Sequence, residues 1–270
     1  MPAASMLPSF SLVGRTAIVT AASRGIGAAI VEALAISGAN ICIHYSSSFD
    51  REVGNEKSAE TLAARCRKQG SETSLIDCDI RDEDAIEKIV DCARRYHGQI
   101  DIAVSNASIQ ELGDYAKISG SSVDRHFHVN FLRMLELAQS VLPDMAASGW
   151  GRFLAIGSVQ QYVASARMPI YSATKAAQFS MVQHLAKCHA AEGVTVNSIS
   201  PGLIATDRNA FRRQDPDDWA DLQTTLCPMG RAGLPEDIQG AALLLCSDAG
   251  SYITGADIQV NGGMLLRAAD

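Results

Sequence analysis

The stretch TAIVTAASRGIGAAI occupies residues 16–30 and decides the fold class. It begins with a short apolar, β-branched run that is typical of a buried strand. A loop containing Gly25 and Gly27 follows, and the apolar residues after it are spaced as on one face of a helix. The first backbone N–H groups of a helix have no partner within it, so such a turn can bind an anion. Two glycines alone are a weak signal, and a plain strand-to-helix connection is an equally good interpretation at this point.

The same alternation of strand and helix continues along the chain. Nearly continuous apolar runs, which suit strands of a parallel sheet buried on both faces, lie at 16–21, 40–45, 73–79, 100–107, 152–159, 194–200 and 257–260. Helix-like stretches separate them, among them 82–98, which begins acidic and ends basic, and 235–250, which begins with proline. The pattern predicts an α/β fold: a single doubly wound Rossmann domain over 1–270, with a mostly parallel seven-stranded sheet and helices on both faces. Residues 1–12 are expected to form an N-terminal tail.

One segment interrupts the alternation between the sixth and seventh predicted strands. Residues 203–230 are polar, mixed in charge and only weakly periodic. Long excursions of this kind often cover an active site, so we expect a substrate lid here. A surface helical hairpin without a gating role is the alternative.

The composition limits the possible partners and the compartment. A net charge of −7 argues against nucleic acid or an anionic membrane as the main partner, and no apolar run approaches the roughly 18 residues of a membrane span. The seven cysteines are scattered without a C-x-x-C pair, which predicts reduced thiols and a cytoplasmic protein. The N-terminal residues lack the basic region of a signal peptide. The rings of His126 and His128 would point to different faces of a helix, so we expect no metal site there.

Five short motifs occur in order and resemble those of one family. TAASRGIG (20–27) resembles T-G-x-x-x-G-x-G, SNAS (105–108) resembles N-N-A-G, IGSV (156–159) contains a serine, YSATK (171–175) matches Y-x-x-x-K, and ISPGLIAT (199–206) resembles a proline–glycine segment. On these motifs the chain resembles the short-chain dehydrogenase/reductase family from Thr20 to Gly262. It is most similar to members such as 3-oxoacyl-carrier-protein reductases and glucose dehydrogenases.

The sequence departs from the family pattern at two glycine positions. Ala21 stands where the family has its first loop glycine, and Ser108 replaces the last glycine of N-N-A-G. Alanine fits position 21 only if its φ is negative, because positive φ favours glycine. We therefore expect a small local adjustment and weaker cofactor binding rather than loss of the site.

The resemblance implies a nicotinamide dinucleotide site at the carboxyl edge of the sheet. Tyr45 stands where NAD enzymes carry an acid for the ribose hydroxyl, Ser46 and Ser47 can donate to a 2′-phosphate, and Arg24 can reach it. These features favour NADP(H) over NAD(H). The alternative is that the serines form a turn and Arg24 points to solvent. The residues implied for cofactor binding are Thr20, Ala22, Ser23, Arg24, Gly25, Ile26, Gly27, Tyr45, Ser46, Ser47, Asp79, Ile80, Asn106, Ala107, Tyr171, Lys175, Pro201, Gly202, Ile204 and Thr206.

Three polar residues carry the predicted chemistry, and a fourth joins them by resemblance. Tyr171 and Lys175 are four residues apart, so on a helix they share one face. A tyrosine can give a proton to a developing alkoxide, and a nearby ammonium favours the phenolate for the reverse reaction. Ser158 would hold and polarise the substrate oxygen. The resemblance adds Asn130 as the residue that carries a proton-relay water.

Together these features predict an NADP(H)-dependent oxidoreductase that moves a hydride between nicotinamide and a ketone or secondary alcohol, as in 3-oxoacyl reductases. A sugar or polyol dehydrogenase of the same family is the nearest alternative. A non-catalytic dinucleotide sensor, or a hydratase or epimerase on the same scaffold, is a weaker one. By analogy with relatives, we expect a small-molecule substrate and a homotetramer or homodimer.

Overall fold

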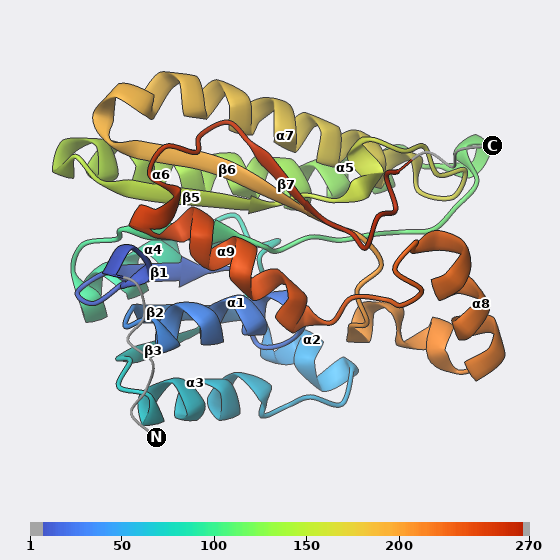
Figure 1. The fold of residues 1–270 in the computed structure, drawn as a ribbon, viewed down its shortest axis with the longest axis horizontal. Helices are drawn as coiled ribbons and strands as arrows, with labels where there is room; N and C mark the ends of the chain where they lie inside the picture. Colours follow the sequence, from blue (N-terminus) through green and yellow to red (C-terminus); the bar gives the residue numbers. More distant parts are fainter. Residues whose placement is uncertain (1–7, 267–270) are drawn as a thin grey trace.

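The computed structural model of the chain describes residues 8–266 and contains one seven-stranded sheet (Figure 1). All six strand pairs are parallel and the order is β3-β2-β1-β4-β5-β6-β7. The predicted Rossmann fold is thus confirmed, with a sheet that is parallel throughout rather than mostly parallel. The strands are β1 (Thr16–Val19), β2 (Asn40–Tyr45), β3 (Thr73–Asp77), β4 (Ile102–Ser105), β5 (Gly151–Ile156), β6 (Val194–Pro201) and β7 (Asp257–Val260).

Helices cover both faces of the sheet, as the continuous apolar strands require. One buried cluster joins the sheet to α1, α3 and α9, and a second joins the opposite face to α4, α6 and α7. The α-helices are α1 (Gly25–Ile36), α2 (Ser47–Glu52), α3 (Ser58–Lys68), α4 (Ala85–His97), α5 (Gly120–Phe127), α6 (Arg133–Ser148), α7 (Pro169–His189), α8 (Pro216–Leu226) and α9 (Gln239–Cys246). A π-helical turn, η3 (His128–Leu132), joins α5 to α6. Short 3-10 turns are η1 (Pro8–Phe10), η2 (Tyr115–Lys117), η4 (Val159–Gln161), η5 (Ala190–Glu192), η6 (Asp207–Arg213), η7 (Pro235–Ile238) and η8 (Asp248–Gly250).

The strand order reverses between β1 and β4, which are neighbours although β2 and β3 separate them in the chain. Crossovers leave this point in opposite directions, so the carboxyl ends of β1 and β4 border a crevice. Ligands of open α/β sheets bind at such a switch point. Four of the five predicted motifs lie at the carboxyl ends of β1, β4, β5 and β6, and the topology therefore gathers them at this edge, whereas YSATK lies on α7.

The ends of the chain and the interrupting segment differ in detail from the predicted elements. The predicted helix over 235–250 is divided into η7, α9 and η8. The first seven residues of the predicted tail 1–12 lie outside the described part, whereas Leu12 is fully buried in the core and its N–H donates to the Ser37 carbonyl at 2.7 Å. Segment 203–230 folds into η6 and α8, which lie at the right of Figure 1, beside the carboxyl edge.

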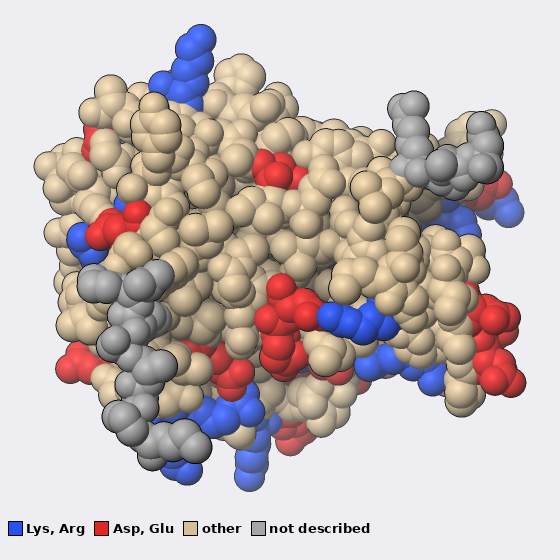
Figure 2. Space-filling model, in the orientation of Figure 1, with Lys and Arg blue, Asp and Glu red and all other residues tan. Residues whose placement is uncertain are grey.

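The surface carries both signs of charge side by side. On the face drawn in Figure 2, acidic and basic side chains are interspersed among broad uncharged areas, with no basic stripe. Within residues 8–266, no helix is both long and apolar enough to cross a bilayer. All seven cysteines are free thiols.

Candidate active site

The loop after β1 turns sharply at Ala21, whose φ is +51°. The expectation of a negative φ at this position is therefore wrong: the alanine adopts the left-handed conformation that its glycine counterpart would adopt freely. Two side chains hold it there, one from β2 and one from the loop after β4. His44 Nδ1 accepts the Ala21 N–H at 2.9 Å, and Asn106 Nδ2 donates to the Ala21 carbonyl at 2.9 Å. The strain of the alanine is offset by hydrogen bonds at both of its backbone groups.

Gly27 lies where the first helix approaches the loop most closely. A Cβ atom at this position would lie 2.7 Å from both the Ala21 carbonyl oxygen and Asn106 Nδ2. Contacts that short require displacement of backbone, so only glycine fits. The glycine thus lets the start of α1 pack directly against the loop.

The N-terminus of α1 fits an anionic group. Arg24 occupies the N-cap position in an extended conformation, and its side chain does not cap the helix. The N–H groups of Gly25, Ile26 and Gly27 are in the first turn and have no helical acceptor. With the helix dipole they form a site suited to a pyrophosphate. The residues present therefore fit the phosphates of a dinucleotide.

Thr20 and Asn106 connect β1 to β4 across the switch point. The Thr20 hydroxyl accepts the N–H groups of Asn106 and Ala107 at 2.9 and 3.0 Å. Asn106 Nδ2 also donates to the Thr20 carbonyl at 2.9 Å. Ala22 is fully buried beside this connection, and its N–H donates to the His44 carbonyl. These predicted cofactor residues thus build the floor of the crevice.

Carboxylates surround Arg24, which the sequence interpretation did not anticipate. Its Nε lies 3.4 Å from Asp50 and its Nη1 lies 3.6 Å from Asp207, while the guanidinium stacks 4.7 Å above the Phe49 ring. Asp50 is buried and also accepts a hydrogen bond from the Ser23 hydroxyl at 3.0 Å. Burial raises the pKa of this carboxyl, while Ser23 and Arg24 act in the opposite direction. Arg24 therefore does not point freely into solvent.

The predicted serines, Ser46 and Ser47, directly follow β2 and lie beside Asp77. Tyr45 is the last residue of the strand and is nearly buried. Ser47 begins the short helix α2, so the three serines are not a loose loop, and its N–H donates to Asp77 Oδ1 at 2.8 Å. The Ser46 hydroxyl lies 3.0 Å from that of Ser48. Ser46 and Ser47 are partly exposed at the carboxyl edge.

After β3, Asp79 and Ile80 lie half-buried at the same edge. Asp79 pairs with Arg81 through both carboxylate oxygens, and these hydrogen bonds hold the pKa of Asp79 below its usual range. On the other side of the crevice, β6 ends at Pro201 and is followed by Gly202, Ile204 and Thr206. Thr206 Cγ2 lies 3.5 Å from where a Cβ of Gly25 would lie. The segment after β6 therefore faces the start of α1.

Lys175 is the most deeply buried charged group of the predicted site. Its side chain is 1% exposed, and its Nζ donates to the Ile156 carbonyl at 2.6 Å and to Gln178 Oε1 at 3.0 Å. Burial, with a smaller contribution from the charge of Arg208, lowers the pKa of this ammonium to about 7. The Nζ lies 5.7 Å from the ring centre of Tyr171, one turn earlier on α7. The predicted pair therefore shares one helix face, as its spacing requires.

Ser158 lies just beyond the carboxyl end of β5, where the chain enters η4. Its hydroxyl accepts the Gln160 N–H at 3.2 Å, which fixes the side chain at the start of this turn. The turn packs against α7, the helix that carries Tyr171. Both residues are mostly buried, with 8% and 7% of their surfaces exposed.

Asn130 lies in the π-helical turn η3, a local irregularity that often marks functional sites. Its Nδ2 donates to the Ile109 carbonyl at 3.0 Å and to the Thr174 hydroxyl at 3.1 Å, and its Oδ1 accepts the Ile109 N–H at 2.8 Å. The residue before Lys175 is thus joined to the loop after β4. The sequence alone gave no signal for Thr174, and none for the roles of His44, Asp50 and Arg208.

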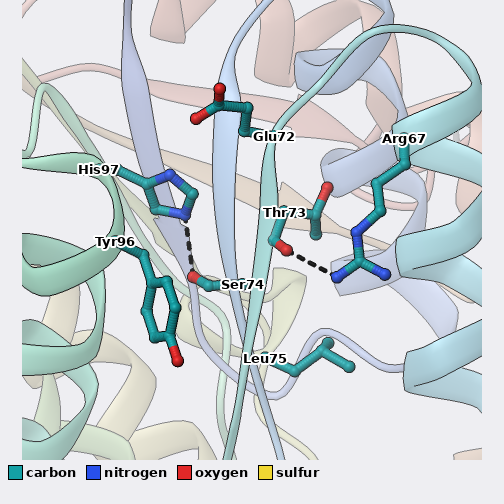
Figure 3. A pocket seen from close by; sticks show the side chains of 7 residues that line it. All are labelled: Arg67, Glu72, Thr73, Ser74, Leu75, Tyr96 and His97. Atoms are coloured by element: carbon teal, nitrogen blue, oxygen red, sulfur yellow. Dashed lines mark hydrogen bonds between the residues drawn. The ribbon is translucent and has the colours of Figure 1, made fainter.

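The pocket in Figure 3 lies away from these residues. It has a volume of about 280 Å³ and opens near the amino end of β3, between the ends of α3 and α4. Its polar groups bond to one another: Arg67 donates to the Thr73 carbonyl at 2.7 Å, and His97 Nε2 lies 2.9 Å from the Ser74 hydroxyl. The predicted site lies at the opposite, carboxyl edge.

Neither histidine of the HFH stretch faces an open metal site. His126 is buried and bonded through both ring nitrogens, to the Ser122 carbonyl at 2.8 Å and the Glu111 N–H at 3.2 Å. His128 Nε2 lies 2.7 Å from Arg133. Over residues 8–266, no three histidine, cysteine, aspartate or glutamate side chains are grouped so that they could hold a metal ion.

Comparison with known proteins agrees with this geometry. Residues 20–265 match the family model described as enoyl-(acyl carrier protein) reductase. The chain is 34% identical to 2-dehydro-3-deoxy-D-gluconate 5-dehydrogenase of Pseudoalteromonas atlantica, covering 97% of this chain and 100% of that protein. It is 32% identical to oxidoreductase UcpA of Escherichia coli K12, covering 94% and 96%.

A solved structure shares both the fold and the sequence. The 3-oxoacyl (acyl-carrier-protein) reductase of Agrobacterium tumefaciens C58, crystallised with NADP, has a TM-score of 0.88 and 37% identity, covering 97% of this chain and 99% of that one. The family match and these relatives extend over nearly the whole chain, including every motif at the carboxyl edge. The chain belongs to the short-chain dehydrogenase/reductase family of oxidoreductases.

Proposed function

We propose that the protein is an NADP(H)-dependent carbonyl reductase and alcohol dehydrogenase, with Tyr171 as the proton donor and acceptor. The observation that carries this proposal is the buried Lys175 ammonium, held 5.7 Å from the Tyr171 ring by the Ile156 carbonyl and Gln178. A lysine buried this deeply without an acidic partner is costly for a structure. Its position beside a tyrosine at the ligand-binding edge supports a catalytic role.

Each of the proposed catalytic residues has a separate task. When bound, the nicotinamide supplies or accepts the hydride. Ser158 hydrogen-bonds the substrate oxygen and orients it, and the Tyr171 hydroxyl gives that oxygen a proton during reduction or removes it during oxidation. The charged form of Lys175 stabilises the phenolate left behind, because opposite charges attract strongly in a buried site.

Asn130 positions this group through its neighbours. Both of its N–H donors and its carbonyl oxygen bond to Ile109 and Thr174, so it fixes the loop after β4 against α7 next to Lys175. We propose that this fixed arrangement holds the proton-relay water that connects Lys175 to solvent. Substitution of Asn130 should therefore lower turnover through altered positioning of Lys175.

For the cofactor we propose NADP(H). Three observations support this choice. Position 45 at the end of β2 is a tyrosine and not an acid, and Arg24 lies beside this end of the strand. The Agrobacterium relative was crystallised with NADP bound. Arg24 can keep its buried partner Asp50 and exchange Asp207, whose side chain is 46% exposed, for a 2′-phosphate. Asp77 near Ser47 opposes a second negative charge there, so Arg24 must carry the preference.

The lid function of residues 203–230 is also a proposal. Two adjacent residues of η6 reach across the crevice in different directions: Asp207 contacts Arg24 and Asn55, and Arg208 donates to Ser108. Such bridges can open for exchange of cofactor and close for the reaction. They support a lid rather than an isolated surface hairpin.

The proposed activity is tested by following NADPH consumption with a panel of 3-oxoacyl thioesters, diketones, sugar acids and aryl ketones. Turnover of one class identifies the substrate, and no turnover of any carbonyl compound contradicts the proposal. A polyol or sugar dehydrogenase is the second candidate, favoured by the similarity to the deoxygluconate dehydrogenase of Pseudoalteromonas. We further propose a cytoplasmic homotetramer or homodimer, whose size light scattering would measure.

A further inference from the structure

Arg208 on η6 extends over the crevice toward the loop after β4. Its Nη2 donates to the Ser108 carbonyl at 2.7 Å and to the Ser108 hydroxyl at 3.0 Å. The hydroxyl exists only because serine replaces the glycine expected at the end of the N-N-A-G motif. The serine at this motif position and the arginine of η6 therefore take part in one contact. They fix a guanidinium at the mouth of the site.

The charge of Arg208 is not neutralised by the protein. The neighbouring carboxylate of Asp207 is turned away, toward Arg24 and Asn55. In the described part of the chain, ion pairs are found for Arg24 and Arg231 near this region but not for Arg208. Its side chain is exposed, and only one of its terminal nitrogens is hydrogen-bonded to the protein. The remaining donors are free to bind an anion.

This guanidinium belongs to the catalytic side of the crevice. Ser108 directly precedes Ile109, both of whose backbone groups bond to Asn130. Arg208 is also close enough to Lys175 for its charge to lower the pKa of that ammonium. By contrast, Thr206, two residues before Arg208, faces the start of α1. Arg208 therefore lies beyond the proposed pyrophosphate position, toward the reacting carbonyl.

We infer that Arg208 binds the carboxylate of the substrate, and that the enzyme acts on oxo acids or hydroxy acids whose carboxylate lies a few bonds from the reacting carbon. This inference rests on the proposed carbonyl reductase function and specifies its substrate class. The planar guanidinium suits two-point binding of a carboxylate, which gives both energy and orientation. Ser108 holds the guanidinium in place before the substrate arrives, which reduces the entropy lost on binding.

The test compares oxo acids with their methyl esters, which differ in charge but share the reacting carbonyl. In the wild-type enzyme kcat/KM should favour the acid over its ester. In Arg208→Met this ratio should fall by about 10- to 100-fold, as expected for loss of a charge-assisted contact. Arg208→Lys should restore part of the ratio. Arg212→Met, also in η6, removes the same charge near Phe211 and serves as the matched control.

Five results would count against the inference, and they are distinguishable. A wild-type ratio near one shows that no carboxylate is recognised. An equal loss for acid and ester in Arg208→Met indicates a structural role in the lid. A raised KM for NADPH with a constant ratio assigns the guanidinium to the cofactor phosphates. Absence of turnover with every acid and ester, while another carbonyl compound is reduced, defeats this inference alone, whereas absence of turnover with every carbonyl compound defeats the proposed function and this inference with it.

Discussion

His44 Nδ1 accepts the backbone N–H of Ala21 at 2.9 Å, and this bond links the end of β2 to the strained turn after β1. The other ring nitrogen, Nε2, lies 3.1 Å from the Cys78 carbonyl, so His44 is neutral with its proton on Nε2. Burial lowers the pKa of His44 to about 4, which agrees with this neutral form. The turn of the cofactor loop therefore depends on the ionisation state of a histidine in the neighbouring strand.

The left-handed conformation of Ala21 gives the first prediction. Glycine at this position removes a strain of roughly 1–2 kcal/mol but gives the unfolded chain more freedom, worth about 0.4–1 kcal/mol. Ala21→Gly should therefore stabilise the protein by about 0.5–1 kcal/mol, measured by urea denaturation. The adjacent Ala22→Gly serves as control and should destabilise, since Ala22 is fully buried and not left-handed. If both variants lose stability alike, the account of the turn is wrong.

The second prediction concerns stability in acid. Between pH 6.5 and about 4, His44 is protonated in the unfolded chain but not in the folded one, so the unfolded state binds more protons. The free energy of unfolding should therefore fall as the pH falls through this range, by about 3 kcal/mol from this residue. His44→Gln should flatten the dependence. His184→Gln, on the exposed face of α7, should leave it as in the wild type, and equal slopes in all three proteins would refute the assignment.

Cofactor preference provides the third prediction. Arg24→Ala should lower kcat/KM for NADPH by about 10- to 100-fold, because a charge-assisted contact to the 2′-phosphate is lost, and should affect NADH much less. Arg51→Ala, a nearby arginine whose side chain is 70% exposed, is the matched control. Asp207→Asn frees Arg24 from one competing carboxylate and should improve NADPH use. A parallel loss with both cofactors in Arg24→Ala would show that Arg24 acts on the loop instead.

The fourth prediction follows from the buried ammonium of Lys175. Its pKa of about 7 lies below the ordinary value of 10.5, so between these values the unfolded chain holds the extra proton. The stability of the cofactor-free enzyme should therefore rise as the pH rises above about 7. Lys175→Met should remove this rise while abolishing turnover, whereas the exposed Lys187→Met should keep it. A pH profile of Lys175→Met that matches the wild type would contradict the burial argument.

The order of elements was predictable because continuous apolar runs demand a sheet covered on both faces, and four of the five motifs lie at the ends of such runs. The pairing of Tyr171 with Lys175 was predictable because helix periodicity alone brings them together. The conformation of Ala21 was not, since it depends on His44 of β2 and on Asn106 from the loop after β4. The neutralisation of Arg24 by Asp50 and Asp207 and the π-helical turn at Asn130 are likewise long-range effects. Local pattern carries no information about such contacts.

The most direct test of the account is the activity of Tyr171→Phe. Only the hydroxyl is removed, so the ring still packs beside Lys175 and NADPH should bind almost as tightly, as measured by quenching or enhancement of its fluorescence. Turnover with the best carbonyl substrate should fall by roughly 100- to 10,000-fold, the usual contribution of a general acid. Near-normal NADPH binding together with this loss of turnover would support the role of Tyr171 as proton donor. A variant that reduces the substrate at the wild-type rate would contradict it.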